Sequence, residues 1–367
     1  MKHANEYTKM KKTLLAIVSF FCSLGLVQAQ EEEQQGFRWE GFVDVYYAYD
    51  FNEPANHIRQ PFLYNHNRHN EFNLNLGLIS GSYTGDKIRA NLAIQAGTYA
   101  QDNYSAEEDL LKHVFQANVG VALNDKDNLW LDAGIFPSHI GFESAISTEN
   151  LTLTRSLLAE NSPYFLSGAK LTYDPTESLT LAALVTNGWQ RIARVDDNQT
   201  PGVGTQLNYH PTDAFSINWS TFIGSDTPDD NRLMRYFNNI YAQWQPSALL
   251  EMVAGFDIGT QESLENGSSY HTWYTPIVIA RVQLDEKLYL AGRAEYYADE
   301  EGVIIDYGAP AGFRTLGLSL NLDYEVTENA MFRIEARHFN SPDDIFASGG
   351  NYTDANTFVV TSLAVNF

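Results

Sequence analysis

Residues 357–367, TFVVTSLAVNF, carry the β-strand pattern from which the fold class follows. Counted back from Phe367, alternate residues lie on two faces: Val365, Leu363, Thr361 and Val359 on an apolar face, and Asn366, Ala364 and Ser362 on a smaller, more polar face. A period of two with one apolar face is typical of a half-buried strand. An aromatic residue at the end of such a strand is typical of bacterial outer-membrane barrels, whose last strand closes the ring. An edge strand of a soluble β-protein fits this segment equally well.

The N-terminal residues have the features of an export signal. Residues 9–12 are rich in lysine, residues 13–26 are apolar, and residues 27–29 (VQA) resemble a signal-peptidase site. We therefore expect residues 1–29 to be a cleaved signal peptide and residues 30–36 to be a short acidic lead-in in the periplasm.

The composition of the mature chain excludes several classes of protein. Removal of residues 1–29 takes away four lysines and one glutamate, which leaves 19 basic and 45 acidic residues and a net charge of −26. This negative charge argues against binding to nucleic acid. Cys22, the only cysteine, lies in the signal, so we expect neither disulfides nor a lipid anchor. No later stretch approaches about 18 consecutive apolar residues, so we expect no transmembrane helix.

Strand patterns recur along the mature sequence. The clearest are at residues 72–76, 87–95, 115–121, 316–324 and 332–337. In each of them one face is apolar and the other face is polar, charged or glycine. The dry core of a two-sheet sandwich would not tolerate the polar face, whereas a wet lumen opposite a lipid face would.

The connections between these segments alternate in length. Long polar links fall at residues 52–69, 101–110, 138–162, 191–201, 226–233, 261–270, 299–310 and 341–352. Tight turns rich in Gly, Pro, Asn and Asp separate them. Outer-membrane barrels have short periplasmic turns and long extracellular loops in this order. We therefore predict an all-β fold, a single transmembrane antiparallel β-barrel of about 16 strands over residues 37–367.

The ends of the strands give two further predictions. The closing strand should pair antiparallel with the first strand, near residues 37–51, and Phe367 should be part of the signal read by the barrel-assembly machinery. Aromatic residues at strand ends should lie in girdles at the two lipid interfaces. These residues are Trp39, Tyr47, Tyr49, Tyr99, Tyr173, Tyr209, Trp244, Tyr297 and Tyr324.

The link at residues 138–162 is unusually long and carries apolar residues, so it should pack on other parts of the chain. It could fold into the barrel as a constriction loop, or form a short helix that caps the mouth. If it folds inward, the constriction would be formed by Glu143, Glu149, Arg155 and Glu160.

Strand parity also gives candidate charged residues of the lumen. These pore-lining candidates are Asp44, Arg89, Lys170, Arg281, Arg293, Glu295, Arg333, Glu335 and Arg337. Rings of charge tune which ions enter a pore. Salt bridges that simply fill a narrow barrel are the alternative.

The histidines give no clear site. His57, His66 and His69 lie in the first long link, where we expect a solvated loop, because no carboxylate or cysteine completes a metal-binding spacing. We expect no metal and no cofactor. An outer-membrane hydrolase could use His271 or His338, but His338 has the outward parity of its strand.

Several short patches resemble one family. They are GFVDVYY at residues 41–47, GIFPSHIGFE at residues 134–143, RSL at residues 155–157, SPYFLSG at residues 162–168 and NGW at residues 187–189. In this order they resemble the OmpL-like β-barrel porin family over most of the mature chain. The resemblance implies pore formation in the outer membrane and supplies no catalytic residues.

These observations favour an outer-membrane porin for passive diffusion of small hydrophilic solutes or ions, with a modest preference for cations. Its expected partners are outer-membrane lipid, the assembly machinery and its solutes, and a homotrimer is common for barrels of this size. A structural or adhesive barrel without a conducting pore, or a hydrolase, remains open.

Overall fold

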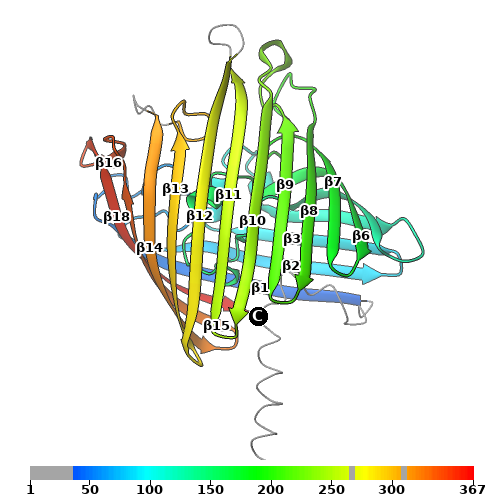
Figure 1. Ribbon diagram of the computed structural model, residues 1–367, viewed down its shortest axis with the longest axis horizontal. Helices are drawn as coiled ribbons and strands as arrows, with labels where there is room; N and C mark the ends of the chain where they lie inside the picture. Colours follow the sequence, from blue (N-terminus) through cyan, green and yellow to red (C-terminus); the bar gives the residue numbers. More distant parts are fainter. Residues whose placement is uncertain (1–35, 264–268, 307–311) are drawn as a thin grey trace, which may run out of the picture.

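The computed structural model describes residues 36–263, 269–306 and 312–367, and these form one closed antiparallel barrel of sixteen strands (Figure 1). The predicted signal peptide and residues 30–35 of the predicted lead-in lie outside the described residues. The barrel confirms the predicted fold class.

The strands follow one another around the ring in chain order. The first eight are β1 (Gly36–Asp50), β2 (Phe72–Gly85), β3 (Ile88–Ala96), β4 (Val114–Ala122), β5 (Leu129–Pro137), β6 (Phe165–Thr176), β7 (Leu179–Thr186) and β8 (Gly202–Thr212). The other eight are β9 (Phe215–Gly224), β10 (Arg235–Ser247), β11 (Leu250–Ser263), β12 (Ser269–Asp285), β13 (Leu288–Asp299), β14 (Phe313–Thr327), β15 (Ala330–Asn340) and β18 (Ala355–Asn366).

Short and long connections alternate as predicted except at the predicted long link of residues 261–270, part of which is strand, because β11 runs to Ser263 and β12 begins at Ser269. One end of the barrel carries only tight turns, and the other carries the loops. We call these the turn end and the loop end. The loops contain short elements: α2 (Thr98–Asn103), α3 (Leu157–Glu160), the 3-10 turns η1 (Leu111–His113), η2 (Ser147–Glu149) and η3 (Asp229–Asn231), and the hairpin of β16 (Phe346–Ser348) and β17 (Asn351–Thr353). Within the described residues, no helix has the length and apolar character needed to cross a membrane.

The ring closes between the first and the last strand, as the sequence predicts. β1 pairs antiparallel with β18, from Phe42 opposite Asn366 to Asp50 opposite Phe358. Phe367 extends this ladder, because its backbone N–H and C=O groups both bond to Gly41, at 2.9 and 2.7 Å. The Phe367 ring lies over Gly41, where a Cβ atom would approach the ring to 2.4 Å.

The two faces of β18 follow the period of two. Leu363 is exposed on the outer face, whereas Phe358, Val360 and Ala364 face inward and are buried. The inward face is therefore more apolar than a water-filled lumen requires, which means that other parts of the chain must cover it.

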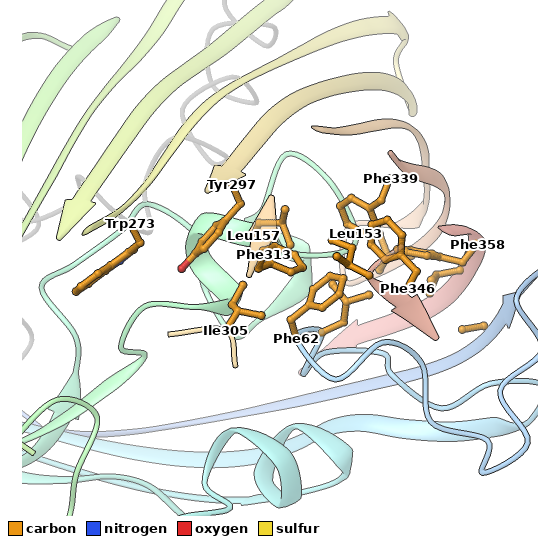
Figure 2. Packing of buried hydrophobic residues seen from close by; sticks show 14 of the residues in the cluster. Phe62, Leu153, Leu157, Trp273, Tyr297, Ile305, Phe313, Phe339, Phe346 and Phe358 are labelled. Carbon is orange, nitrogen blue, oxygen red and sulfur yellow. The ribbon is translucent and has the colours of Figure 1, made fainter. Parts of the chain in front are cut away.

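Two loops cover it by folding into the barrel: loop 1 (residues 51–71) and loop 3 (residues 138–164). Figure 2 shows Phe62 of loop 1 and Leu157 of loop 3 packed among rings of the wall, including Phe313 and Phe358. The Phe62 and Phe313 ring centroids are 4.8 Å apart. A hydrophobic core therefore lies inside the barrel, where the two loops meet the wall.

The prediction of a solvated first loop is wrong. His66 and His69 are buried, and Phe62 and Leu63 are only 2% exposed. Two adjacent apolar side chains stabilise the inward position by their burial, on the order of 1.5–3 kcal/mol each. Some polar groups around them find partners inside the barrel: Arg59 Nη1 donates to the His66 carbonyl at 2.7 Å, whereas Arg59 Nε and His66 Nδ1 have no partner among the described residues.

The structure places most of the aromatic residues of the predicted girdles on the outer face, with two exceptions. Trp39, Tyr173, Tyr209, Trp244 and Tyr324 are exposed on the outer face. The assignment of Tyr99 and Tyr297 to the girdles is wrong, since both are buried inside the barrel. Tyr297 shares the inward parity of Glu295, and Tyr99 belongs to α2 rather than to a strand.

The barrel wall has unequal height. β3, β4 and β5 have 9 residues each, whereas β12 has 17. Figure 1 shows β11 and β12 reaching furthest at the loop end. A strand needs about 9–11 residues to cross a bilayer when tilted, so β3, β4 and β5 are just long enough, and β7, with 8 residues, is the shortest strand of the ring.

Candidate functional site

Arg333 on β15 holds the deepest part of loop 3. Its Nε and Nη2 atoms donate to the two carboxylate oxygens of Asp323 on β14, at 2.7 and 2.8 Å. The same guanidinium donates to the backbone carbonyl oxygens of Ser147 and Asn150. The bidentate ion pair orients the guanidinium, so its remaining N–H groups face the loop.

A second ion-pair group lies closer to the loop end on β13 and β15. Arg293 donates to Glu335 at 2.7 Å, and Arg337 donates to Glu295 through Nε at 3.0 Å. All four side chains are no more than 3% exposed. We call the inner faces of β13, β14 and β15 the anchoring wall.

Loop 3 is bonded directly to this second group. The Thr154 N–H donates to Glu335 at 2.6 Å, and the Leu157 N–H donates to Glu295 at 2.7 Å. Arg337 donates to the backbone carbonyl of Arg155 at 2.8 Å. Each of these four charges on β13 and β15 therefore bonds both an opposite charge and the loop backbone, which offsets the cost of its burial.

Within loop 3, Glu143 joins two parts of the loop by hydrogen bonds to Ser156. Its carboxylate accepts hydrogen bonds from the N–H and the hydroxyl of Ser156, and it lies 3.9 Å from Arg293. Burial raises the pKa of the Glu143 carboxyl above its ordinary value, and Arg293 opposes this shift.

Glu149 is exposed near the turn end, where neighbouring Thr148 accepts a hydrogen bond from Asn366.

Glu160 clamps loop 1 to loop 3. Its carboxylate accepts three hydrogen bonds from loop 1, from the backbone N–H of Tyr64 at 3.1 Å and from the N–H and side-chain amide of Asn65 at 3.2 and 3.1 Å. Arg155 lies in the same interior region, stacked on the ring of Tyr164.

Loop 1 is also fixed to the barrel wall through Asp44 on β1. The Nε2 atom of His66 lies 2.9 Å from Asp44 Oδ2, and Asn75 on β2 donates to the same oxygen at 3.2 Å. Ser362 on β18 donates to the other carboxylate oxygen. This carboxylate therefore joins loop 1 to the strands of the seam.

The lumen-facing side chains of the other walls are less deeply covered. Arg89 on β3 makes a bidentate ion pair with Asp132 on β5, at 2.7 and 2.6 Å. Lys170 on β6 lies 5.2 Å from the ring of Phe136. Arg89 and Lys170 are both half-buried. We call the inner faces of β3 to β6 the opposite wall.

Arg281 on β12 lies apart from both groups, nearer the turn end. It donates to Glu251 on β11 at 2.7 Å, and both side chains are half-buried. The structure thus brings together nine of the thirteen charged candidates around the two inner loops, and leaves Arg89, Lys170, Arg281 and the exposed Glu149 outside that network.

Sequence reasoning missed the loop 1 partners of Glu160 and also His139. His139 follows β5, is 6% exposed and approaches the Thr221 carbonyl with Nε2 at 2.9 Å. Its own carbonyl accepts from Gln206 and Ser220. Burial lowers the pKa of His139 to about 4. The signal for loop 1 was present in the apolar pair Phe62-Leu63, but nothing local points to His139.

Two of the other histidines make single hydrogen bonds within the protein. His338 faces outward and its Nδ1 lies 2.7 Å from the hydroxyl of Thr357. In loop 1, His69 Nδ1 accepts from the backbone N–H of Asp50. The described part of the chain holds no group of three His, Cys, Asp or Glu residues arranged around a metal.

Three solved structures illustrate the similarity of the fold. The anion-selective porin from Comamonas acidovorans is 8% identical, with 90% of this chain and 99% of that chain covered and a TM-score of 0.60. The outer membrane channel DcaP of Acinetobacter baumannii is 10% identical, with 92% and 99% covered and a TM-score of 0.60. The trimer form of OmpT, an outer membrane protein of Vibrio cholerae, is 10% identical, with 90% and 99% covered and a TM-score of 0.57.

At such low identity these similarities establish the fold alone. No curated protein matches the sequence significantly. A family model described as "Putative beta-barrel porin-2, OmpL-like" matches residues 36–367, which is nearly the whole chain. The turn end is therefore the periplasmic end, the loop end is extracellular, and the chain belongs to the OmpL-like β-barrel porin family of the outer membrane.

Proposed function

We propose that this porin conducts small hydrophilic solutes and ions by passive diffusion along the opposite wall. The proposal rests on one observation: the inner loops cover the charged residues of the anchoring wall more fully than those of the opposite wall. Loop 3 is bonded to the anchoring wall, where Arg293, Arg333 and Arg337 are buried, whereas Arg89 and Lys170 remain partly accessible. A path beside the loops would be narrow and lined by polar and charged groups.

In this proposal the charges of loop 3, of β1 and of the anchoring wall that bond within the network around the two inner loops position the constriction, and the partly accessible charges meet the solute. We assign the first role to Glu143, Arg155, Glu160, Asp44, Arg293, Glu295, Arg333, Glu335 and Arg337. We assign contact with solute to Arg89, Lys170, Arg281 and Glu149. The ion pairs with Asp132 and Glu251 neutralise Arg89 and Arg281, so Lys170 is the cation with the greatest influence on passing ions.

We further propose a modest preference for cations. The mature net charge of −26 raises the concentration of cations at both mouths, and charged groups within a narrow pore tune this effect. Lys170→Glu should increase the preference for K⁺ over Cl⁻ by about twofold or more, because it reverses a partly screened lumen charge. The zero-current potential in a KCl gradient measures this ratio.

Lys287→Glu, at the periplasmic turn before β13, is the matched control with the same change of net charge. An equal shift in both variants would show that Lys170 does not face the conduction path. Swelling of liposomes in sugars of increasing size would define the solute range, and a folded barrel that passes none of them would contradict diffusion.

A structural barrel without a conducting pore is the second candidate, and a specific observation favours it. Residues of loop 1, loop 3 and the wall form a hydrophobic cluster inside the barrel (Figure 2). The absence of conductance in a correctly folded protein would support this candidate. Hydrolysis of a chromogenic ester that is lost on replacement of His271 or His338 would support an enzyme instead.

We also propose that the protein assembles as a homotrimer. The support is the structural similarity to OmpT in its trimer form. Its partners would be outer-membrane lipid and, during biogenesis, the assembly machinery. Analytical ultracentrifugation in detergent tests the assembly, and a monomer at all concentrations would contradict it.

A further inference from the structure

A row of polar side chains crosses the inner face of β10 to β13 at one level of the barrel. Asn239 on β10 pairs with Asp257 on β11, and Asp257 pairs with Thr275 on β12. The register between β12 and β13 continues the row to Tyr297. All four residues are no more than 1% exposed. Directly opposed residues on one face of a sheet have Cβ atoms about 4.5–5.5 Å apart, so each member of this row lies beside the next.

Asp257 differs from the other buried carboxylates of the described residues, each of which has an ionic partner or at least two hydrogen bonds. Asp323, for example, pairs with Arg333, and Asp299 accepts three backbone N–H groups. Within the described residues, Asp257 forms no ion pair and accepts one hydrogen bond, from the side-chain amide of Asn239 at 2.5 Å. Its negative charge is therefore left without compensation from the protein.

The layers on both sides of the row are apolar. Toward the loop end, the rings of Phe237 and Trp273 are buried, with centroids 6.1 Å apart. Toward the turn end, Ile277 and Phe142 of loop 3 meet over Gly255, where a Cβ atom would approach each of them to 3.0 Å. An unpaired charge in apolar surroundings carries a large free-energy cost, so an ionised carboxylate here needs a cation beside it.

Two hydroxyl groups of the row also lack partners. Among the described residues, Thr275 Oγ1 and Tyr297 Oη are buried and bond neither to the Asp257 carboxylate nor to any other group. The Tyr297 phenol lies close enough to Asp257 to interact with its charge. Figure 2 shows the Tyr297 hydroxyl pointing away from Phe313 and toward the side of the barrel that carries Trp273. The row thus presents a carboxylate and two hydroxyl oxygens that are neighbours without being bonded to one another.

We propose that Asp257, Thr275 and Tyr297 bind one alkali cation, Na⁺ or K⁺, inside the barrel wall. Carboxylate and hydroxyl oxygens are ligands for hard cations. A single carboxylate balances one positive charge, whereas a divalent ion would leave an uncompensated charge in apolar surroundings. A proton on Asp257 would give one O–H donor and could serve only one of the two hydroxyl groups, while a cation accepts lone pairs from both.

The cation would also fix the start of loop 3. The amide nitrogen of Asn239 donates to Asp257, which turns the amide oxygen toward the loop, where it accepts from the Gly141 N–H at 3.1 Å. A cation keeps the carboxylate ionised, and an ionised carboxylate only accepts hydrogen bonds, so it holds the amide in this orientation. Cation binding should therefore slow hydrogen exchange at the Gly141 amide.

Thermal unfolding of the refolded mature barrel in detergent tests the site, with KCl or NaCl replacing choline chloride at constant ionic strength. The unfolding temperature should rise with either salt, because a ligand that binds only the folded state stabilises it by mass action. Asp257→Asn keeps the shape of the side chain and removes its charge, so it should abolish this rise and the slower exchange at Gly141. Asp213→Asn, at an exposed position in the turn between β8 and β9, makes the same change of net charge and should respond like the wild type.

Tyr297→Phe removes one oxygen ligand and should raise the K⁺ concentration for half-maximal protection of Gly141 about tenfold. An unchanged concentration would remove Tyr297 from the site. A response of Asp257→Asn equal to that of the wild type would overturn the proposal, as would a wild type that behaves alike in choline, Na⁺ and K⁺. Protection by Ca²⁺ at lower concentrations than K⁺ would overturn the choice of an alkali cation. None of these measurements involves conductance, so the site and the diffusion path are tested separately.

Discussion

At the scale of single residues, the interior depends on buried polar groups that each bond to more than one part of the chain. Glu160 joins two loops, Asp44 joins loop 1 to the seam, and Arg333 joins the wall to loop 3. A buried hydrogen-bond donor without a partner costs about 1–3 kcal/mol, so removal of one such residue should loosen a whole loop.

The Glu160→Gln substitution tests this expectation at the contact between loop 1 and loop 3. An amide group has one acceptor oxygen, so at least one of the donors from Tyr64 and Asn65 would face an NH₂ group. Hydrogen exchange of the backbone amides of residues 62–66 should accelerate about tenfold or more, as expected for a loss of one hydrogen bond to a charged group. Glu53→Gln, at an exposed position of the same loop, is the control and should leave these amides unchanged. Equal exchange in both variants would contradict the clamp.

The burial of His139 should make the stability of the fold decrease as the pH is lowered. Its pKa is lowered to about 4 by burial, below the ordinary value of about 6.5, so the unfolded chain binds the proton more tightly. The neutral His139 ring contributes to the free energy of unfolding above pH 6.5, and this contribution is lost as the pH falls toward about 4. The loss is at most about 3 kcal/mol. Urea unfolding in detergent at pH 7.5 and 4.5 measures this loss.

His139→Gln removes the titrating ring and keeps a donor for the Thr221 carbonyl. The difference in stability between the two pH values should therefore be smaller in this variant than in the wild type. His338→Gln, on the outer face, should retain the full wild-type difference. The account of His139 fails if the two variants behave alike.

At the scale of elements, the strands were predictable and the loop positions were not. The period of two in β18 reports directly which side chains face lipid, because a strand in a barrel has one lipid face and one lumen face. The Glu160 contacts join residues 95 positions apart in sequence, and no local pattern encodes such a pair. The composition of loop 1 also suggests a solvated loop, because residues such as Asn65 and His66 find their partners, Glu160 and Asp44, only in the folded interior.

The seam between β1 and β18 gives a prediction at this scale. Deletion of Phe367 removes the two backbone hydrogen bonds to Gly41, worth about 0.5–1.5 kcal/mol each, and the ring that covers Gly41. The amount of heat-modifiable barrel in the outer membrane should fall several-fold, and barrels that do assemble should conduct normally.

Phe72→Ala removes an exposed outward ring at the other end of the wall and serves as the control. If the protein without Phe367 inserts as well as this control does, Phe367 contributes nothing special to closure or to assembly.

At the scale of the whole molecule, the protein is a closed barrel with an interior partly filled by its own loops. The alternation of loop lengths predicted the closed ring and the sidedness, because both follow from threading one chain through a membrane. The extent of filling depends on three-dimensional contacts between loops 1 and 3 and the anchoring wall. Such contacts decide whether the barrel conducts, and they are visible only in the folded structure.

Single-channel recording of the refolded mature chain in planar bilayers tests the central claim, that a diffusion path remains beside the two inner loops. The account predicts discrete conductance steps from the wild type and larger or more frequent openings from Glu160→Gln, whose loop clamp is weakened. A heat-modifiable, correctly folded barrel that shows no conductance, with or without the Glu160 substitution, would contradict it.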